Sequence, residues 1–227
     1  MDNNLILFLF ILISFLSGAI PTGVVVSKVI FGFDIRTKGS GNMGSTNVMR
    51  VLGTKWGLFV QIIDILKGYL PVFIISSFYA PELLINSFFA DNIIILKLIL
   101  GFSAVLGHIF SPFVGFKGGK GINTATGMLV AISPIDIGIA FVCFWLVVFS
   151  SGYISLGSMT AGFILPISLL VRYNLLNQDV NNYITTLIFF FVVALLILFT
   201  HKGNISRLRQ GNENKFEKLH IIKFGAK

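Results

Sequence analysis

Long apolar runs, separated by short polar segments, dominate the pattern of hydrophobic and polar positions along the chain. A helix needs about 20 mainly apolar residues to cross the hydrocarbon core of a bilayer. By this measure the pattern predicts seven transmembrane helices, near residues 5–30, 56–79, 92–110, 121–135, 137–151, 155–173 and 182–200. The fourth and fifth are short and share one apolar stretch, which is interrupted at Ser133-Pro134-Ile135-Asp136. We therefore expect an all-α, polytopic membrane protein that forms a single domain over residues 1–227.

The composition supports this class. Hydrophobic residues make up 55% of the chain and charged residues 11%, whereas a soluble domain carries about 25% charged residues. The net charge of +8 fits basic cytoplasmic loops and anionic substrates better than nucleic acid, which we do not expect as a partner. The single cysteine, Cys143, lies in an apolar run, so no disulfide framework and no cysteine metal site are expected. Asp64 and Lys67, three positions apart, are expected to form a structural ion pair.

The distribution of basic residues predicts the orientation in the membrane. The first apolar run resembles a signal peptide, but its flank, Asp2-Asn3-Asn4, has no basic residue, which favours a retained helix with the N-terminus outside. Seven spans then place 13 of the 17 Lys and Arg residues in the cytoplasm, within segments 31–55, 111–120, 152–154 and 201–227. Merging the fourth and fifth spans would move the C-terminal segment, with its seven basic residues, outside. The positive-inside rule therefore favours seven spans and a cytoplasmic C-terminus.

Two polar clusters interrupt this apolar pattern, Gly39-Ser40-Gly41-Asn42-Met43-Gly44 and Phe116-Lys117-Gly118-Gly119-Lys120-Gly121. Glycines let a backbone turn so that several N–H groups face one anion, and nearby lysines supply positive charge. In the predicted topology both clusters lie at the cytoplasmic face, with the Tyr153-Ile154-Ser155 junction and His201-Lys202-Gly203-Asn204. The pattern indicates an anion-binding site where a lipid and a water-soluble phosphate meet.

Each of these features also has a purely structural interpretation. The glycines of the first cluster can mediate helix packing, although they lie in a basic loop rather than an apolar helix. The second cluster is not a Walker motif, because Val114 replaces its first glycine and Gly121 replaces its Ser or Thr. Its two lysines can serve only to set the topology. His108 and His201, each at the inner end of a predicted span, can simply bond a carbonyl group.

Three segments resemble the signatures of the bacterial acyl-phosphate:glycerol-3-phosphate acyltransferases, the PlsY family. They are GSGNMGSTNVMR at residues 39–50, GHIFSP at 107–112 followed by FKGGKG at 116–121, and HKGNISRL at 201–208 with Gly211 and Glu213. SGAIPTG at residues 17–23 and DILKG at 64–68 also match, so the resemblance covers nearly the whole chain in order. The departures are small, with Ser45 where the family often has alanine and Asn212 where it often has threonine.

The chain lacks the catalytic pair that many other acyltransferases use. Neither His108 nor His201 begins a His-x-x-x-x-Asp motif, because Phe113 and Ser206 occupy the Asp positions. The nine acidic residues do not cluster, so no metal and no other cofactor is expected. An acyl phosphate is already activated, and its transfer can rest on positioning and charge stabilisation alone.

The resemblance implies transfer of a fatty acyl group from acyl phosphate to the sn-1 hydroxyl of glycerol 3-phosphate. The products would be lysophosphatidic acid and inorganic phosphate, in phospholipid biosynthesis, with a donor phosphate oxygen as the base and without coenzyme A. The expected location is the inner (plasma) membrane of a bacterium, with the site at its cytoplasmic face and membrane lipid around it. We expect a monomer.

The candidate phosphate-binding residues come from both clusters. The first cluster is expected to hold the donor phosphate through Gly39, Ser40, Gly41 and Asn42. The acceptor phosphate is expected to bind the basic residues Arg50 and Lys117, with Lys120 as a further candidate. The spacing alone does not choose between the two lysines.

The candidate catalytic residues are polar side chains at the predicted cytoplasmic face: Ser40, His108, Ser155, His201 and Asn204. Of these, Ser155, His201 and Asn204 are expected to orient the glycerol hydroxyls. His108 either bonds the reacting groups or supports the second cluster.

Two other classes of membrane protein fit the sequence less well. An organophosphate transporter would be expected to show internal repeats and charge near the membrane midplane, whereas the charge here is interfacial and no repeat is seen. An amino-alcohol phosphotransferase would need clustered aspartates for a metal, which the sequence lacks.

Overall fold

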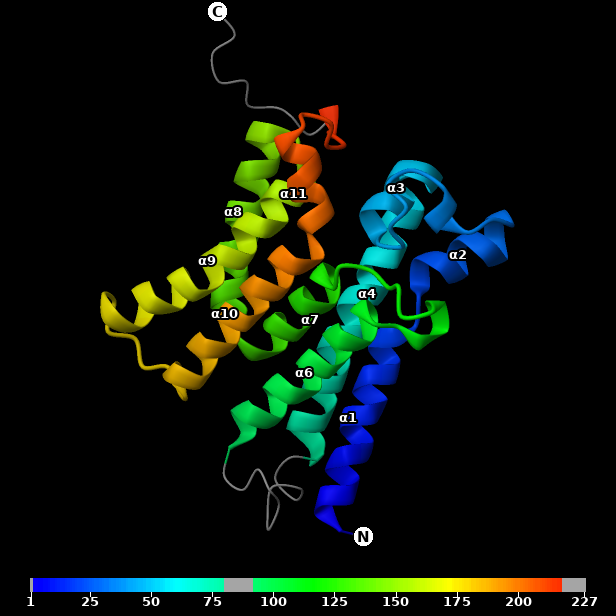
Figure 1. The fold of residues 1–227 in the computed structure, drawn as a ribbon. Coiled ribbons are helices and arrows are strands. Elements are labelled where there is room, and N and C mark those ends of the chain that lie inside the picture. Colours follow the sequence, from blue (N-terminus) through cyan, green and yellow to red (C-terminus); the bar gives the residue numbers. More distant parts are fainter. Residues whose placement is uncertain (1, 80–91, 218–227) are drawn as a thin grey trace, which may run out of the picture. The chain divides into compact units, whose positions relative to one another are not determined.

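The computed structural model describes residues 2–79 and 92–217, and every regular element within these ranges is a helix (Figure 1). The chain divides into two compact units, Met1–Ile132 (unit 1) and Ser133–Lys227 (unit 2), and each is described by itself. Residues 218–227, which the charge count assigned to a cytoplasmic tail, lie outside the described ranges.

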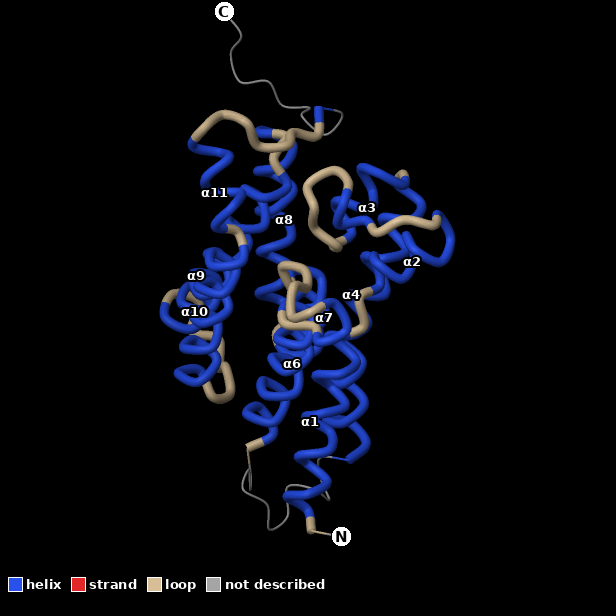
Figure 2. The backbone as a smooth tube through the Cα atoms, turned by 45° about the vertical axis from the view of Figure 1, so that its right-hand side comes forward, coloured by secondary structure: helices blue, strands red, loops and turns tan. Residues whose placement is uncertain are grey.

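Unit 1 is a group of helices with two loops at one end. Its helices are α1 (Asn3–Ala19), α2 (Thr22–Phe31), α3 (Ser45–Leu52), α4 (Thr54–Ile74), α6 (Ile93–Ile109) and α7 (Ile122–Ile132). Shorter turns are η1 (Ile35–Thr37), η2 (Ile75–Tyr79), which continues α4 with π-helical geometry, and η3 (Pro112–Val114). Both views show α1, α4, α6 and α7 running side by side (Figures 1 and 2), and α4 packs against α6 and α7 while α1 packs against α6.

Glycines allow the helix backbones of unit 1 to approach closely. A Cβ added at Gly68 of α4 would lie 1.9 Å from the carbonyl oxygen of Thr124, and one at Gly127 of α7 would lie 1.9 Å from that of Ile65. The α1–α6 contact has the same reciprocal form, with Gly18 against the Ala104 carbonyl and Gly107 against that of Phe15. Small residues of this kind are typical of packed transmembrane helices, where close backbone contact replaces the hydrophobic effect as the driving force.

The first predicted span is not one continuous helix. The stretch near 5–30 forms α1 and α2, which are bent by 44° at the break between them. Ile20 has extended dihedral angles (φ −57°, ψ 117°), as expected of a residue before a proline. Pro21 carries no N–H and cannot continue the α-helical hydrogen-bond ladder. The apolar run is therefore continuous in sequence but not in structure.

Five helical stretches of the described ranges are long and apolar enough to cross a membrane, or six if the bent pair α1–α2 counts as one. The five are Thr54–Tyr79, Ile93–Val114, Pro134–Ser151, Ile154–Asn174 and Tyr183–Thr200. The remaining predicted span, near 121–135, corresponds to α7, which has 11 residues. At about 1.5 Å per residue this helix is shorter than the hydrocarbon core of a bilayer is thick. The number of crossings therefore stays a prediction.

Unit 2 consists of α8 (Pro134–Ser151), α9 (Ile154–Asn174), α10 (Tyr183–Thr200) and α11 (Lys202–Arg209), with α9 packed against both α8 and α10. The predicted interruption at residues 133–136 is confirmed, because α8 begins at Pro134 after the non-helical Ser133. Asp136 is fully buried and accepts hydrogen bonds from Ser168 (2.6 Å) and Arg172 (2.6 Å) of α9. This buried ion pair ties the start of α8 to the last turns of α9.

Candidate active site

The first loop, residues 38–44, connects η1 to α3 and is organised by one side chain. Gly39 and Gly41 have positive φ angles of 60° and 74°, which glycine adopts without steric cost. Asn47, in the first turn of α3, is 1% exposed. Its Oδ1 accepts from the backbone N–H of Ser40 (2.8 Å), and its Nδ2 donates to the carbonyls of residues 35, 38 and 42. Asn47 thus holds the loop to the helix, a role that the sequence analysis missed.

Three backbone amides of the first loop are already committed to internal hydrogen bonds. The Ser40 amide donates to Asn47, the Gly41 amide to the Lys38 carbonyl (3.2 Å) and the Gly44 amide to Oδ1 of Asn42 (2.8 Å). These three amides are therefore bonded within the protein, and anion binding by the first cluster stays a prediction. The Ser40 residue itself is exposed, so its side chain remains accessible to a ligand.

The second loop, residues 115–121, closes onto the end of α6. The amides of Gly118 and Gly119 donate to the carbonyls of Ile109 (3.0 Å) and His108 (3.1 Å). These bonds satisfy carbonyl groups that the end of a helix otherwise leaves without an intrahelical partner. A Cβ at Gly118 would lie 2.0 Å from the His108 carbonyl oxygen, and one at Gly119 would lie 2.2 Å from His108 Nε2. The glycines therefore permit close approach, while Lys117 is exposed and Lys120 is half-buried.

His108 lies beneath the second loop, beside a buried polar cluster. It is 4% exposed, its Nδ1 is 4.0 Å from Oδ1 of Asp64, and within the described ranges Nδ1 has no hydrogen-bond partner. The predicted ion pair is confirmed, with Lys67 Nζ 2.9 Å from Asp64 Oδ1. Lys67 also donates to Thr22 and, at 2.5 Å, to the Ile20 carbonyl at the α1–α2 break. This geometry matches the loop-supporting alternative for His108, and it gives the ion pair a structural role at the break.

The two loops of unit 1 lie close together. Arg36 Nη1 donates to the Val114 carbonyl (3.3 Å), which joins the base of the first loop to the base of the second. Asn123, at the start of α7, donates to Oγ of Ser45 at the start of α3 (2.8 Å). Ser45 lies where the family signature often has alanine, a side chain that could not accept this hydrogen bond.

Two of the three predicted residues of unit 2, Ser155 and Asn204, meet at a carboxylate. Ser155 Oγ donates to Glu213 Oε1 (3.0 Å), Asn204 Nδ2 donates to the same oxygen (2.7 Å), and Arg207 Nε donates to Oε2 (2.7 Å). Ser155 and Asn204 are 6% and 5% exposed. In the sequence, Glu213 is part of a signature, but no role was predicted for it. An acidic residue inside a strongly basic segment was the signal available for it.

His201 lies beside a carbonyl group, as its purely structural interpretation predicts. It is 1% exposed, and its Nδ1 lies 2.8 Å from the carbonyl oxygen of Ile197, one turn earlier in α10. Arg50, in the last turn of α3, is half-buried. Within the described ranges no group of three His, Cys, Asp or Glu residues is placed to hold a metal ion. The candidate residues thus lie partly in unit 1 and partly in unit 2.

The chain is similar to glycerol-3-phosphate acyltransferases along nearly its whole length. The family model described as Glycerol-3-phosphate acyltransferase matches residues 8–211. A curated protein of that name from Chlorobium phaeobacteroides is 41% identical over 230 residues, which cover 94% of this chain and 95% of the relative. Another, from Fusobacterium nucleatum, is 39% identical and covers 92% of this chain and 98% of the relative.

Solved structures are similar to this chain as well. A crystal structure of PlsY, described as an integral membrane glycerol 3-phosphate acyltransferase in its glycerol 3-phosphate form, matches with a TM-score of 0.78 and 34% identity, over 95% of this chain and 98% of that one. The lysophosphatidic acid form of PlsY matches with a TM-score of 0.76. Family model, relatives and fold agree, and the chain belongs to the PlsY family of integral membrane glycerol-3-phosphate acyltransferases.

Proposed function

We propose that this glycerol-3-phosphate acyltransferase takes its acyl group from an acyl phosphate and transfers it to the sn-1 hydroxyl of glycerol 3-phosphate. The observation that carries the proposal is the pair of glycine-rich loops joined within unit 1 by Arg36 and Asn123. A reaction between two phosphate compounds needs two neighbouring anion sites. The donor phosphate would lie at the first loop, near Ser40, and the acceptor phosphate near Arg50 and Lys117, with Lys120 as the further candidate.

The chemistry needs no dedicated base in this proposal. The sn-1 hydroxyl oxygen attacks the acyl carbon, the bond from that carbon to the phosphate oxygen breaks, and the hydroxyl proton goes to the departing phosphate. The products are lysophosphatidic acid and inorganic phosphate. The residues of unit 2 would orient the hydroxyls, and the bonds from Ser155 and Asn204 to Glu213 would hold those two side chains in fixed rotamers. His108 would support the second loop by packing against Gly119.

The proposal includes a membrane arrangement. We place the N-terminus outside and the C-terminus in the cytoplasm of a bacterium, with seven crossings of the inner membrane and both glycine-rich loops on the cytoplasmic side. The support is the distribution of 13 of the 17 basic residues. In this arrangement α1 and α2 form one bent crossing and α7 a short one. Units 1 and 2 would act as a single domain in a monomer.

The test measures inorganic phosphate released by the purified protein in detergent, from acyl phosphate with and without glycerol 3-phosphate. We expect release that depends on glycerol 3-phosphate, matches the lysophosphatidic acid formed, persists in excess chelator and is not reproduced with acyl-CoA as donor. Equal activity with acyl-CoA would contradict the choice of donor. Collapse of activity in chelator would contradict a reaction that needs no metal. Movement of glycerol 3-phosphate across vesicle membranes without phosphate release would favour the transporter class.

A further inference from the structure

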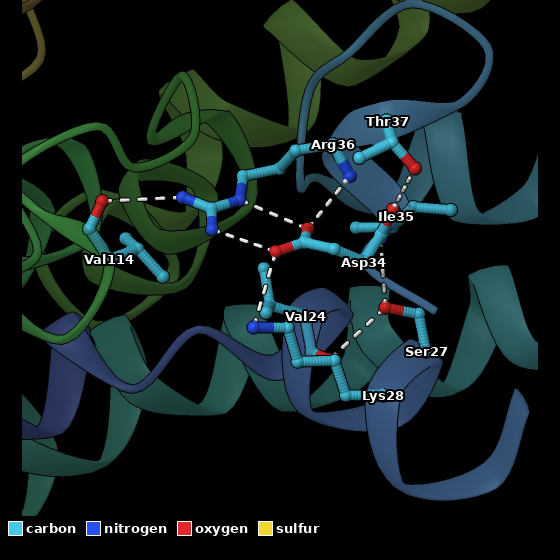
Figure 3. A network of polar contacts seen from close by, with 8 residues as sticks. All are labelled: Val24, Ser27, Lys28, Asp34, Ile35, Arg36, Thr37 and Val114. Atoms are coloured by element: carbon cyan, nitrogen blue, oxygen red, sulfur yellow. Dashed lines mark hydrogen bonds and ion pairs between the residues drawn. The ribbon is translucent and has the colours of Figure 1, made fainter. Parts of the chain in front are cut away.

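A charged network at the base of the first loop reaches the second loop (Figure 3). Asp34 precedes η1, and its side chain accepts from the backbone N–H of Arg36 (3.0 Å), so the carboxylate is fixed by its own turn. Arg36 Nε and Nη2 donate to the two carboxylate oxygens at 3.0 and 2.8 Å. This is the forked pairing that only a planar guanidinium makes, and it sets the orientation of the group as well as its position.

The pair is electrostatically well matched. The Arg36 guanidinium beside Asp34 holds the pKa of that carboxyl well below its usual range, and Asp34 raises the pKa of Arg36. Each partner therefore favours the charged form of the other. The Asp34 side chain is 17% exposed and that of Arg36 32%, so the pair is partly shielded from solvent.

The third nitrogen of the guanidinium group, Nη1, bonds the backbone just before the second loop. Arg36 Nη1 donates to the carbonyl of Val114, the last residue of η3. Val114 is buried, and it is followed directly by Gly115 and Phe116, both with positive φ, and then by Lys117. On its other side Arg36 is followed, two residues later, by the first loop, and its carbonyl would lie 3.5 Å from a Cβ added at Gly41.

We propose that Arg36 is a positioning residue that fixes the first loop relative to the second, and so sets the distance between the two bound phosphates. This inference rests on the proposed function for its chemical meaning, since the two loops are taken to hold donor and acceptor. Arg36 itself contacts no substrate in this proposal. With Nε and Nη2 held by Asp34, the rigid guanidinium plane fixes the direction in which the N–H groups of Nη1 point. A shift of about 1 Å in a positioning group can lower a rate about a hundredfold.

Two substitutions and a matched control test the proposal. Arg36→Gln removes the fork, and Arg36→Lys keeps the charge but cannot make the paired contact to Asp34 and reach Val114. Lys28→Gln is the control, because Lys28 Nζ lies 3.3 Å from the same Asp34 oxygen, is 56% exposed and makes no link between the loops. For both Arg36 variants we expect kcat to fall about ten- to a hundredfold with the KM of each substrate changed by less than about threefold. The control should stay within about twofold of wild type.

A second measurement needs no substrate. Spin labels at Lys38→Cys and Phe113→Cys, both exposed positions, report the distance between the loops in a Cys143→Ala background. We expect a narrow distance distribution in the otherwise unchanged protein and in Lys28→Gln, and a broader one in Arg36→Gln. If wild type does not use acyl phosphate, the proposed function fails while this distance still tests the link between the loops.

Four outcomes would overturn the proposal. Full recovery of kcat in Arg36→Lys would mean that charge alone matters. A rise in one KM at unchanged kcat would make Arg36 a binding residue. An unchanged distance distribution, or a loss of thermal stability in detergent that parallels the loss of activity, would leave it a support of the fold only.

Discussion

The two glycine-rich loops of unit 1 have similar compositions and different construction. The first is held by a side chain, Asn47, and its glycines at 39 and 41 are needed for positive φ. The second is held by its own backbone against the end of α6, and Gly118 and Gly119 are needed because a Cβ would strike His108. Glycine at position 41 therefore serves dihedral freedom in the first loop, whereas glycine at positions 118 and 119 serves close approach in the second. Replacing it with alanine should fail for different reasons in the two places.

The largest effect is expected from Gly118→Ala. The added Cβ would lie 2.0 Å from the carbonyl oxygen of His108, which belongs to the end of α6 and cannot move aside as a flexible side chain can. The loop would have to lift from the helix, with loss of the Gly118–Ile109 and Gly119–His108 bonds. We expect the unfolding free energy to fall by about 1–3 kcal/mol and turnover to be lost with it, as measured by thermal unfolding in detergent beside an activity assay.

Gly115→Ala provides the control in the same loop. Gly115 has a φ of 67°, and no heavy atom lies within 4 Å of the Cβ it would gain. It therefore introduces dihedral strain without a collision and should cost less stability than Gly118→Ala. Wild-type stability and turnover in Gly118→Ala would show that the second loop does not depend on its close backbone contact with the end of α6.

The next effect is expected from Gly41→Ala in the first loop. Here the new Cβ would be in ordinary contact, 3.5 Å from the Arg36 carbonyl, so the cost is the positive φ of 74°, about 1–2 kcal/mol. The loop lies outside the packed helices, so the protein should remain folded while the strained loop loses its substrate geometry. We expect activity to be abolished with a small change in thermal stability.

Gly32→Ala separates this effect from strain in general. Gly32 follows α2 with a φ of 73°, and no heavy atom lies within 4 Å of the Cβ that alanine would add. The Gly32→Ala protein should therefore lose a similar amount of stability and keep its activity. Full activity in Gly41→Ala would reject an anion site in the first loop. A parallel loss of stability and activity there would return its glycines to a packing role.

Some features of this fold could be predicted from the sequence and others could not. Apolar runs predicted most helices, because transfer to lipid is a property of a segment and not of its partners. The break at Pro21 was visible in the sequence, yet the prediction took the run near 5–30 as one span. Proline acts on the backbone of its neighbours, Ile20 above all, and changes the mean hydropathy of a long apolar run only slightly. The Asp64–Lys67 pair was predictable because its members are close in sequence.

The site was predictable in its residue types and less so in its connections. Ser155 and Asn204 were selected as polar residues at the same predicted membrane face, and the structure brings them to one carboxylate, Glu213, whose role was not predicted. Asn47 was missed because a side chain that bonds four backbone groups has no signal until the loop is folded around it. For the same reason no sequence shows which amides of a glycine-rich loop are already satisfied.

Arg50→Ala is expected to have a smaller effect than Gly118→Ala or Gly41→Ala. It tests a predicted contact between the protein and the acceptor phosphate. A guanidinium contact to phosphate is charge-assisted and contributes about 1.5–3 kcal/mol. We therefore expect a roughly ten- to hundredfold loss in kcat/KM for glycerol 3-phosphate, mostly as a raised KM if the contact is equal in ground and transition states. Lys55→Ala, an exposed basic residue at the start of α4, removes one charge from the same predicted cytoplasmic segment and should leave KM unchanged. An unchanged KM and rate in a folded Arg50→Ala protein would mean that Arg50, like Lys55, serves only the orientation of the chain in the membrane.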